Sequence, residues 1–277
     1  MSAAVEGRAG PGRIAAAFAD LGARRQAGFI PFLMAGDPDL DTTLELMRAA
    51  VAAGADLIEL GVPFSDPMAD GPVLQRSAER ALRAGAMLPG VLAVLARFRA
   101  ESAVPVVLFG YANPFLRYGA EALARDARAA GADGLLCVDV PPEEADDLQP
   151  ACDAAGLDMI FLLSPTSDRE RIARVRARAR GFVYYVSITG TTGAAAPDAA
   201  EVAAMVDKVR AATGLPVGVG FGITDAAQAA AVARIADAVI VGSAVMRLVE
   251  EHAGLDLLPA ARAFLARMAD AVHAARR

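Results

Sequence analysis

Short apolar runs recur along the chain, and the longer segments between them place apolar residues every three or four positions. The runs are nearly continuous rather than alternating, as in parallel strands buried on both faces, and the segments between them have the period of amphipathic helices. We therefore predict eight strands, near residues 29–35, 57–60, 104–109, 134–138, 159–163, 182–187, 217–220 and 238–241.

A repeated turn marks where helices end and strands begin. The letters AAGAD occupy residues 52–56 and 129–133, and AAGLD occupies residues 154–158, each between a helical pattern and an apolar run. Glycine ends a helix readily because it can adopt a positive φ. The turns are unevenly spaced, which indicates successive β/α units rather than a fixed-period repeat.

Eight strands alternating with helices predict an α/β fold, a single-domain (β/α)8 TIM barrel over residues 1–277. Additional helices are expected at 13–26, before the first strand, and at 73–84 and 87–101, between the second and third strands. Residues 1–11 are expected to be flexible. In such a barrel the loops that follow the strands gather at one end, where active sites lie.

Composition narrows the classes of partner. The net charge is −6 and no basic cluster dominates a segment, so we expect no nucleic acid partner. The start of the chain lacks the pattern of a signal peptide, and no apolar run is long enough to span a bilayer. We therefore expect a cytoplasmic protein without a membrane partner.

The scarcity of some residue types narrows the chemistry. Lys208 is the only lysine, and the only histidines, His252 and His273, lie near the C-terminus. The chain therefore has few residues that could form a Schiff base or a histidine metal site, and we expect no metal. Cys137 and Cys152 lie in apolar or helical patterns, which suits reduced, packed thiols. Carboxylates, hydroxyls and backbone groups must carry any chemistry.

Two acids are candidates for that chemistry. Glu59 ends an apolar strand, and Asp70 lies in the loop rich in proline, glycine and aspartate that follows. Burial disfavours a charged carboxylate and raises its pKa, so two acids in unlike surroundings can divide acid and base roles. The alternative is structural: Glu59 would pair with an arginine, and the loop acids would only satisfy turn geometry.

Three late turns contain glycines and favour an anion site. They occupy residues 190–193, 220–224 and 242–244, after the sixth, seventh and eighth strands. Glycine lets backbone N–H groups approach an anion closely, and Ser243 opens a helical run whose N-terminus attracts negative charge. The position of these turns in an eight-fold β/α count favours phosphate over simple turns. We expect residues 193–198 to form a lid over the bound ligand.

Several motifs together resemble one family, the alpha subunit of tryptophan synthase. They are residues 31–38, residues 59–67 with 69–72, residues 111–114, residues 139–141 and the three glycine turns, in order and at the family's spacing from about residue 13 onward. The resemblance implies retro-aldol cleavage of indole-3-glycerol phosphate to indole and glyceraldehyde 3-phosphate, in the last steps of tryptophan biosynthesis. It implies no cofactor in this chain.

The resemblance also assigns roles to residues. Glu59 would act as acid and base, Asp70 would accept the indole N–H, and Tyr184 would help to place Glu59 and the glycerol portion. Asp139 either supports the site or is a strand-end hydrogen bonder. The expected substrate-binding residues are Phe32, Tyr111, Leu136 and Ile240 for the indole and Thr192, Gly193, Gly222, Gly242 and Ser243 for the phosphate.

A partner is implied as well. The family works with a beta subunit that carries pyridoxal phosphate, as an alpha2beta2 heterotetramer, and Asp66 and Asn113 would face it. The family often has Gly-Val-Thr-Gly where this chain has Gly190-Thr191-Thr192-Gly193, with alanines following instead of a basic residue. This departure bears on lid closure and on coupling to the partner.

Three rival functions share much of this pattern. A lyase that releases indole without a partner would look nearly the same, and a non-catalytic barrel that binds a phosphate ligand could regulate a partner. A sugar-phosphate isomerase would share the phosphate site but not the motif from Glu59 to Pro72.

Overall fold

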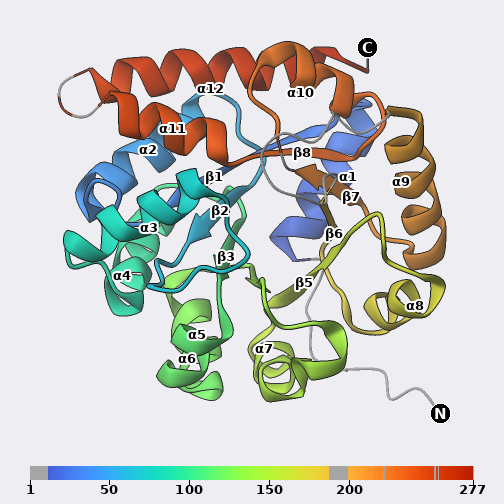
Figure 1. Cartoon of the computed structure of the whole chain (residues 1–277), viewed down its shortest axis with the longest axis horizontal. Coiled ribbons are helices and arrows are strands. Elements are labelled where there is room, and N and C mark those ends of the chain that lie inside the picture. Colours follow the sequence, from blue (N-terminus) through green and yellow to red (C-terminus); the bar gives the residue numbers. More distant parts are fainter. Residues whose placement is uncertain (1–11, 187–198, 221, 253, 255, 277) are drawn as a thin grey trace.

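Eight parallel strands close into a barrel, and helices surround it (Figure 1). The computed structural model describes residues 12–186, 199–220, 222–252, 254 and 256–276. The predicted (β/α)8 barrel with extra helices is therefore confirmed. The strands are β1 (Gly28–Met34), β2 (Ile58–Gly61), β3 (Val106–Gly110), β4 (Gly134–Cys137), β5 (Asp158–Leu163), β6 (Val183–Val186), β7 (Val217–Gly220) and β8 (Ala238–Val241). The expected flexibility of residues 1–11 and the expected lid at 193–198 lie outside the described residues.

The helices follow the predicted order. They are α1 (Arg13–Arg24), α2 (Leu40–Ala52), α3 (Pro72–Arg83), α4 (Leu88–Arg99), α5 (Ala112–Tyr118), α6 (Ala120–Ala130), α7 (Gln149–Ala155), α8 (Arg169–Arg178), α9 (Ala199–Thr213), α10 (Ala226–Ala233), α11 (Ser243–Glu251) and α12 (Leu257–Ala274), with a 3₁₀ helix η1 (Pro142–Asp147). The additional helices are α1, before the barrel, and a second helix in the segments after β2, β3 and β8.

Side chains along each strand divide the core into two parts. A large cluster lies between the barrel and the helices, and a smaller one fills the barrel. The inner cluster takes alternate residues along the strands other than β7, because successive side chains point to opposite faces. It contains Leu57 immediately before β2, Leu136 of β4, Tyr184 of β6 and Ile240 of β8. Ile14 of α1 joins it and closes the N-terminal end of the barrel.

Aspartates that precede strands hold the N-terminal end together. Asp56, Asp133 and Asp237 precede β2, β4 and β8, and their carboxylates accept the backbone N–H of Phe29, Val106 and Val217 at 2.8, 2.9 and 2.9 Å, respectively. Each of these N–H groups lies at the start of the neighbouring strand. The aspartate of the AAGAD turn therefore joins adjacent strands at the end of the barrel that serves stability.

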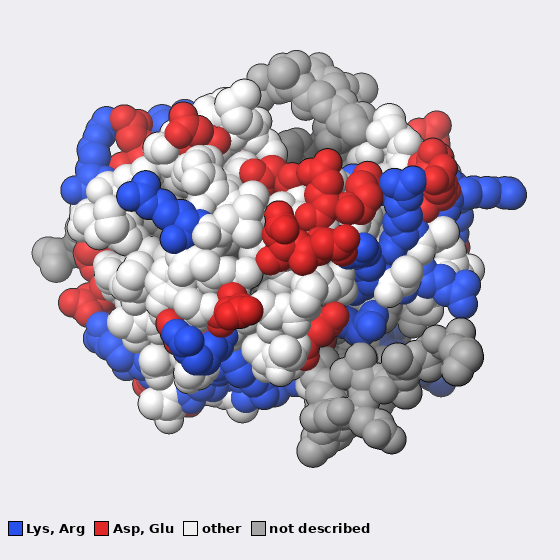
Figure 2. Space-filling view, turned by 90° about the horizontal axis from the view of Figure 1, so that it is seen from below, with Lys and Arg blue, Asp and Glu red and all other residues white. Residues whose placement is uncertain are grey.

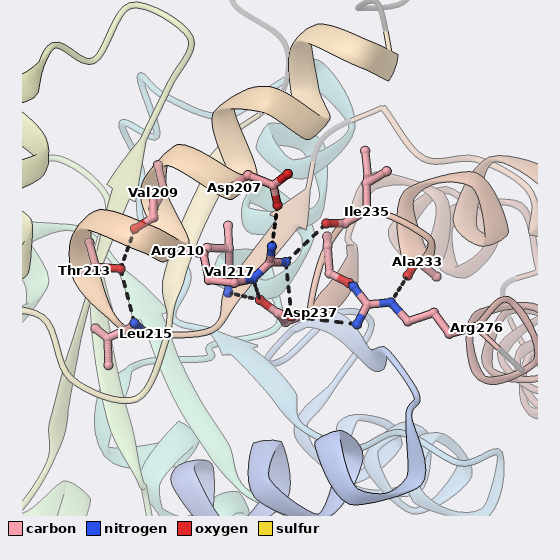
Figure 3. A network of polar contacts seen from close by, with 11 residues as sticks. Asp207, Val209, Arg210, Thr213, Leu215, Val217, Ala233, Ile235, Asp237 and Arg276 are labelled. Atoms are coloured by element: carbon pink, nitrogen blue, oxygen red, sulfur yellow. Dashed lines mark hydrogen bonds and ion pairs between the residues drawn. The ribbon is translucent and has the colours of Figure 1, made fainter.

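Basic groups complete each of these sites, as at Asp237 (Figure 3). Arg210 of α9 contacts Asp237 through Nε at 3.0 Å and also donates to the backbone carbonyl of Ile235 at 3.2 Å. Arg276 lies 3.8 Å from the same carboxylate. These contacts tie α9 and the C-terminal end of the chain to the start of β8.

Within the described ranges, no single helix is long and apolar enough to cross a membrane; one bent pair, α3 with α4, meets the criteria of length and composition at an angle of 94°.

Candidate active site at the carboxyl ends of the strands

Glu59 lies inside the barrel, on β2. Its neighbours in register are Phe32 of β1 and Val107 of β3, and it points to the same side of β2 as Leu57 of the inner cluster. The residue is 1% exposed, and burial raises the pKa of its carboxyl to about 8. The side chain is therefore mostly protonated at neutral pH and can donate a proton.

The surroundings of Glu59 differ from those of other buried acids. Asp37 accepts hydrogen bonds from Ser77 and Arg80, and Asp133 accepts from Arg13 and Arg99. Glu59 Oε1 has no hydrogen-bond partner among the residues that the structure describes. The structural alternative, in which an arginine pairs with Glu59, finds no such pair within the described part of the chain. A buried carboxyl oxygen without a hydrogen-bond partner costs stability, which makes this side chain a candidate for function.

Asp70 lies at the end of the loop between β2 and α3 and is half-buried. Burial raises the pKa of its carboxyl to about 6, and a hydrogen bond from Tyr111 limits the rise. The Tyr111 hydroxyl also accepts the backbone N–H of Ala69 at 3.1 Å, and its ring lies 5.5 Å from that of Phe64. Tyr111 therefore holds the loop that carries Asp70, beyond its expected contact with the indole. At pH 7 Asp70 is mostly ionised while Glu59 is mostly protonated.

Tyr184 of β6 reaches across the barrel toward the two acids. Burial raises the pKa of its hydroxyl well above 10, and the charges of Glu59 and Asp70 raise it further. The hydroxyl lies against Gly220 of β7, where a Cβ atom would come within 2.2 Å of it. Only glycine leaves this space, so the sequence of β7 is what allows Tyr184 to point toward the acids.

An apolar wall surrounds the acids. Phe32 meets Phe109 edge to face, with 5.1 Å between the ring centres. Leu136 and Ile240 lie deeper, in the inner cluster, where both are buried. Four partly buried residues at the ends of β3 to β6 pack against this cluster and were not among the residues predicted from the sequence: Phe109, Val138, Leu162 and Val186. Each follows an inner residue by two positions, so strand alternation could have found them.

The described part of the anion site lies at the ends of β7 and β8. Gly222 is exposed and adopts φ 76°, and Gly242 precedes α11 without a side-chain cap. The first N–H groups of α11, beginning at Ser243, are thus open to an anion at the same end of the barrel as Glu59. Thr192 and Gly193 lie outside the described residues. Within the described chain, no group of three or more histidine, cysteine, aspartate or glutamate side chains could hold a metal ion.

Two exposed segments lie at the same end of the molecule. Asp66 is exposed in the loop that carries Asp70, and Asn113 is exposed at the start of α5. Asp139, also exposed, accepts the backbone N–H of Ala112 at 2.8 Å. Asp139 is therefore a strand-end hydrogen bonder that fixes the start of α5, next to Tyr111.

Comparisons with known proteins agree on one family. The family of the tryptophan synthase alpha chain matches residues 18–272. The tryptophan synthase alpha chain of Citrifermentans bemidjiense is 53% identical over 246 residues, 89% of this chain and 92% of that protein. That of Burkholderia pseudomallei is 56% identical over 242 residues, covering 87% and 89% of the two chains.

Solved structures give the same result. The crystal structure of tryptophan synthase subunit alpha from Legionella pneumophila superposes with a TM-score of 0.88 at 41% identity, covering 95% of this chain and 99% of that one. A tryptophan synthase structure from Mycobacterium tuberculosis gives a TM-score of 0.87 at 39% identity, covering 95% and 99% of the two chains. The chain therefore belongs to the tryptophan synthase alpha chain family.

Proposed function

We propose that Glu59, Asp70 and Tyr184 cleave indole-3-glycerol phosphate into indole and glyceraldehyde 3-phosphate. This cleavage is the reaction of the family, a carbon–carbon lyase step of tryptophan biosynthesis. The observation that carries the assignment is the buried carboxyl of Glu59, which has a pKa of about 8 and an oxygen without a hydrogen-bond partner among the described residues. Asp70, whose pKa is about 6, acts together with Glu59 on the hydroxyl of Tyr184. Such a pair supplies an acid and an anion at the same pH.

The reaction needs two proton transfers. Protonated Glu59 gives its proton to indole C3, which places a positive charge on the ring. The C3–C3′ bond then breaks, its electron pair returns to the ring, and the C3′ hydroxyl becomes the aldehyde of the product. The Glu59 carboxylate accepts the hydroxyl proton, so the side chain ends in its starting protonation state.

Asp70 stabilises the charge that develops on the ring. Its carboxylate accepts the indole N–H, and a fixed negative charge opposite a developing positive one lowers the barrier most where water is excluded. Tyr184 is a buried hydroxyl near both acids and helps to place the glycerol portion. The ring itself holds the charge, so the step needs no cofactor from this chain. Pyridoxal phosphate belongs, in this proposal, to the beta subunit.

The binding residues divide the substrate between two regions. Phe32, Tyr111, Leu136 and Ile240 hold the indole, with Phe109 added because it packs on Phe32. The phosphate lies against Gly222, Gly242 and Ser243, where backbone N–H groups and the N-terminus of α11 attract an anion. Thr192 and Gly193 complete this site by resemblance.

The partner is a tryptophan synthase beta subunit, and we propose an alpha2beta2 assembly formed in the cytoplasm. Asp66 and Asn113 lie beside exposed apolar side chains, Met68 at 90% and Leu116 at 42% exposure. Near them a hollow of about 410 Å³ is lined by residues of α5, η1 and the loop after β4. Figure 2 shows acidic side chains gathered on the underside of the molecule, and η1 carries four acids. A beta surface with exposed apolar and basic groups would fit these features.

Indole release from indole-3-glycerol phosphate tests the proposed function. We expect the isolated chain to release indole slowly. Addition of a beta subunit should raise the rate of indole release at least several-fold, because docking orders the loops that carry the site. Equal rates with and without the beta subunit would favour the partner-free lyase. Absence of indole in both reactions would favour a regulatory barrel or a sugar-phosphate isomerase and would refute the proposal.

A further inference from the structure

A network of charged side chains joins three elements around the active site. Asp37, in the loop after β1, is fully buried and accepts hydrogen bonds from Arg80 of α3 at 2.8 and 2.6 Å. Arg80 also donates to Glu250 of α11 at 3.0 Å. Arg76, one turn earlier on α3, meets Glu250 with two hydrogen bonds of 2.7 and 2.8 Å. We call these four residues the α3–α11 clamp.

Interactions within α3 and within α11 disfavour the charges that form the clamp. Arg76 and Arg80 are like charges four residues apart on one face of α3, which repel each other. Glu250 is in the last turn of α11, where the helix dipole disfavours a carboxylate. Hydrogen bonds from Arg76, followed by the charges of both arginines, nevertheless lower the pKa of Glu250 to about 2. The favourable contacts of these groups are therefore the ones made between elements.

The clamp joins the two helices that begin at the two parts of the proposed substrate site. α3 begins at Pro72, two residues after Asp70, and α11 begins at Ser243, in the proposed anion site. The two helices pack against each other, and Asp37 ties α3 to the end of β1. The separation between the acid loop and the phosphate site therefore depends on how α3 and α11 are held together.

We propose that Asp37, Arg76, Arg80 and Glu250 are positioning residues that set the distance between Asp70 and the N-terminus of α11. The inference rests on the proposed function, because it concerns one substrate held at both ends. A fixed distance favours ligands in which a three-carbon chain joins the indole to the phosphate. A linked ligand must contact the acid loop and the anion site at the same time, so its affinity depends on the distance between them. A fragment that fills only one of these two regions does not depend on that distance.

Glu250→Gln tests the proposal, because glutamine keeps the size of the side chain and removes its charge while the Asp37–Arg80 pair remains. We expect the Kd of an indole carrying a three-carbon phosphate chain to rise about tenfold. The Kd values of indole alone and of glycerol 3-phosphate alone should stay within about twofold of wild type, and kcat/KM for indole-3-glycerol phosphate should fall with the linked affinity. Glu79→Gln, an exposed acid of α3 paired with Arg83, is the matched control and should change none of these values.

Two further variants separate positioning from stability. Arg76→Gln combined with Glu250→Gln should weaken binding of the linked ligand little more than either change alone, because both changes remove the same contact. Exchange of the charges, Arg76→Glu with Glu250→Arg, should recover part of the linked affinity. The positioning role is refuted if Glu250→Gln weakens the single fragments as much as the linked ligand, or if linked binding is unchanged. A wild-type chain that releases no indole would instead refute the proposed function, whatever the clamp does to binding.

Discussion

Glu59→Gln should lower indole release from indole-3-glycerol phosphate by about 1000-fold or more. Glutamine fills the same space but has no acidic proton to give to indole C3, and it cannot accept the proton of the C3′ hydroxyl. General acid–base contributions are typically about 10²- to 10⁴-fold, and Glu59 serves in both transfers. Single-turnover formation of indole, with the isolated chain in excess over substrate, measures the chemical step directly.

Stability measurements show whether Glu59→Gln acts on chemistry alone. Burial raises the pKa of Glu59 from 4.5 to about 8, so the folded state binds a proton that the unfolded chain releases. The free energy of unfolding of the wild type should therefore fall as pH rises from 4.5 through 8, and the variant should lack this loss. A variant that unfolds more readily than wild type at pH 8, or that retains its turnover, would contradict the role given to Glu59.

Asp70→Asn should lower kcat by about 100-fold while changing KM much less. The asparagine oxygen can still accept the indole N–H, so the substrate can bind, but the amide has no charge to oppose the positive ring. Loss of one preorganised electrostatic contact typically costs about 10²- to 10³-fold in kcat. Steady-state kinetics with indole-3-glycerol phosphate separate the two constants.

The control for Asp70→Asn is Tyr111→Phe, which keeps Asp70 but removes the hydroxyl that contacts both it and Ala69. It should have a smaller effect on kcat than Asp70→Asn, because the charge remains. A rise in KM with kcat unchanged in Asp70→Asn would mean that Asp70 contributes equally to binding of the ground state and of the transition state. That outcome would leave the charge on the ring without a stabilising group.

The barrel could be predicted from sequence because its local signals agree with its global fold. Apolar runs, helix periods and glycine turns all indicate β/α units, and eight such units commonly close into a parallel barrel. The inward direction of Glu59 follows from the same pattern, since it shares a face of β2 with Leu57. The family motifs then gave the reaction.

Features that depend on contacts between distant residues were not predictable. The glycine of the AAGAD turns predicts the end of a helix, but nothing local predicts that Asp56 and Asp133 each accept a backbone N–H from a residue 27 positions earlier in the chain. The space that Gly220 leaves for Tyr184 depends on the register of β6 and β7. The α3–α11 clamp joins Arg76 to a residue 174 positions away. No local period in the sequence encodes such pairs.

The pH dependence of kcat/KM for indole-3-glycerol phosphate tests the central claim most directly. Activity requires Asp70 ionised and Glu59 protonated, and burial gives their carboxyls pKa values of about 6 and about 8. The profile should rise through pH 6, level off, and fall through pH 8, and the lower limb should disappear in Asp70→Asn. An activity that is constant or still rising from pH 7 to pH 9 would contradict a buried, protonated Glu59 as the proton donor.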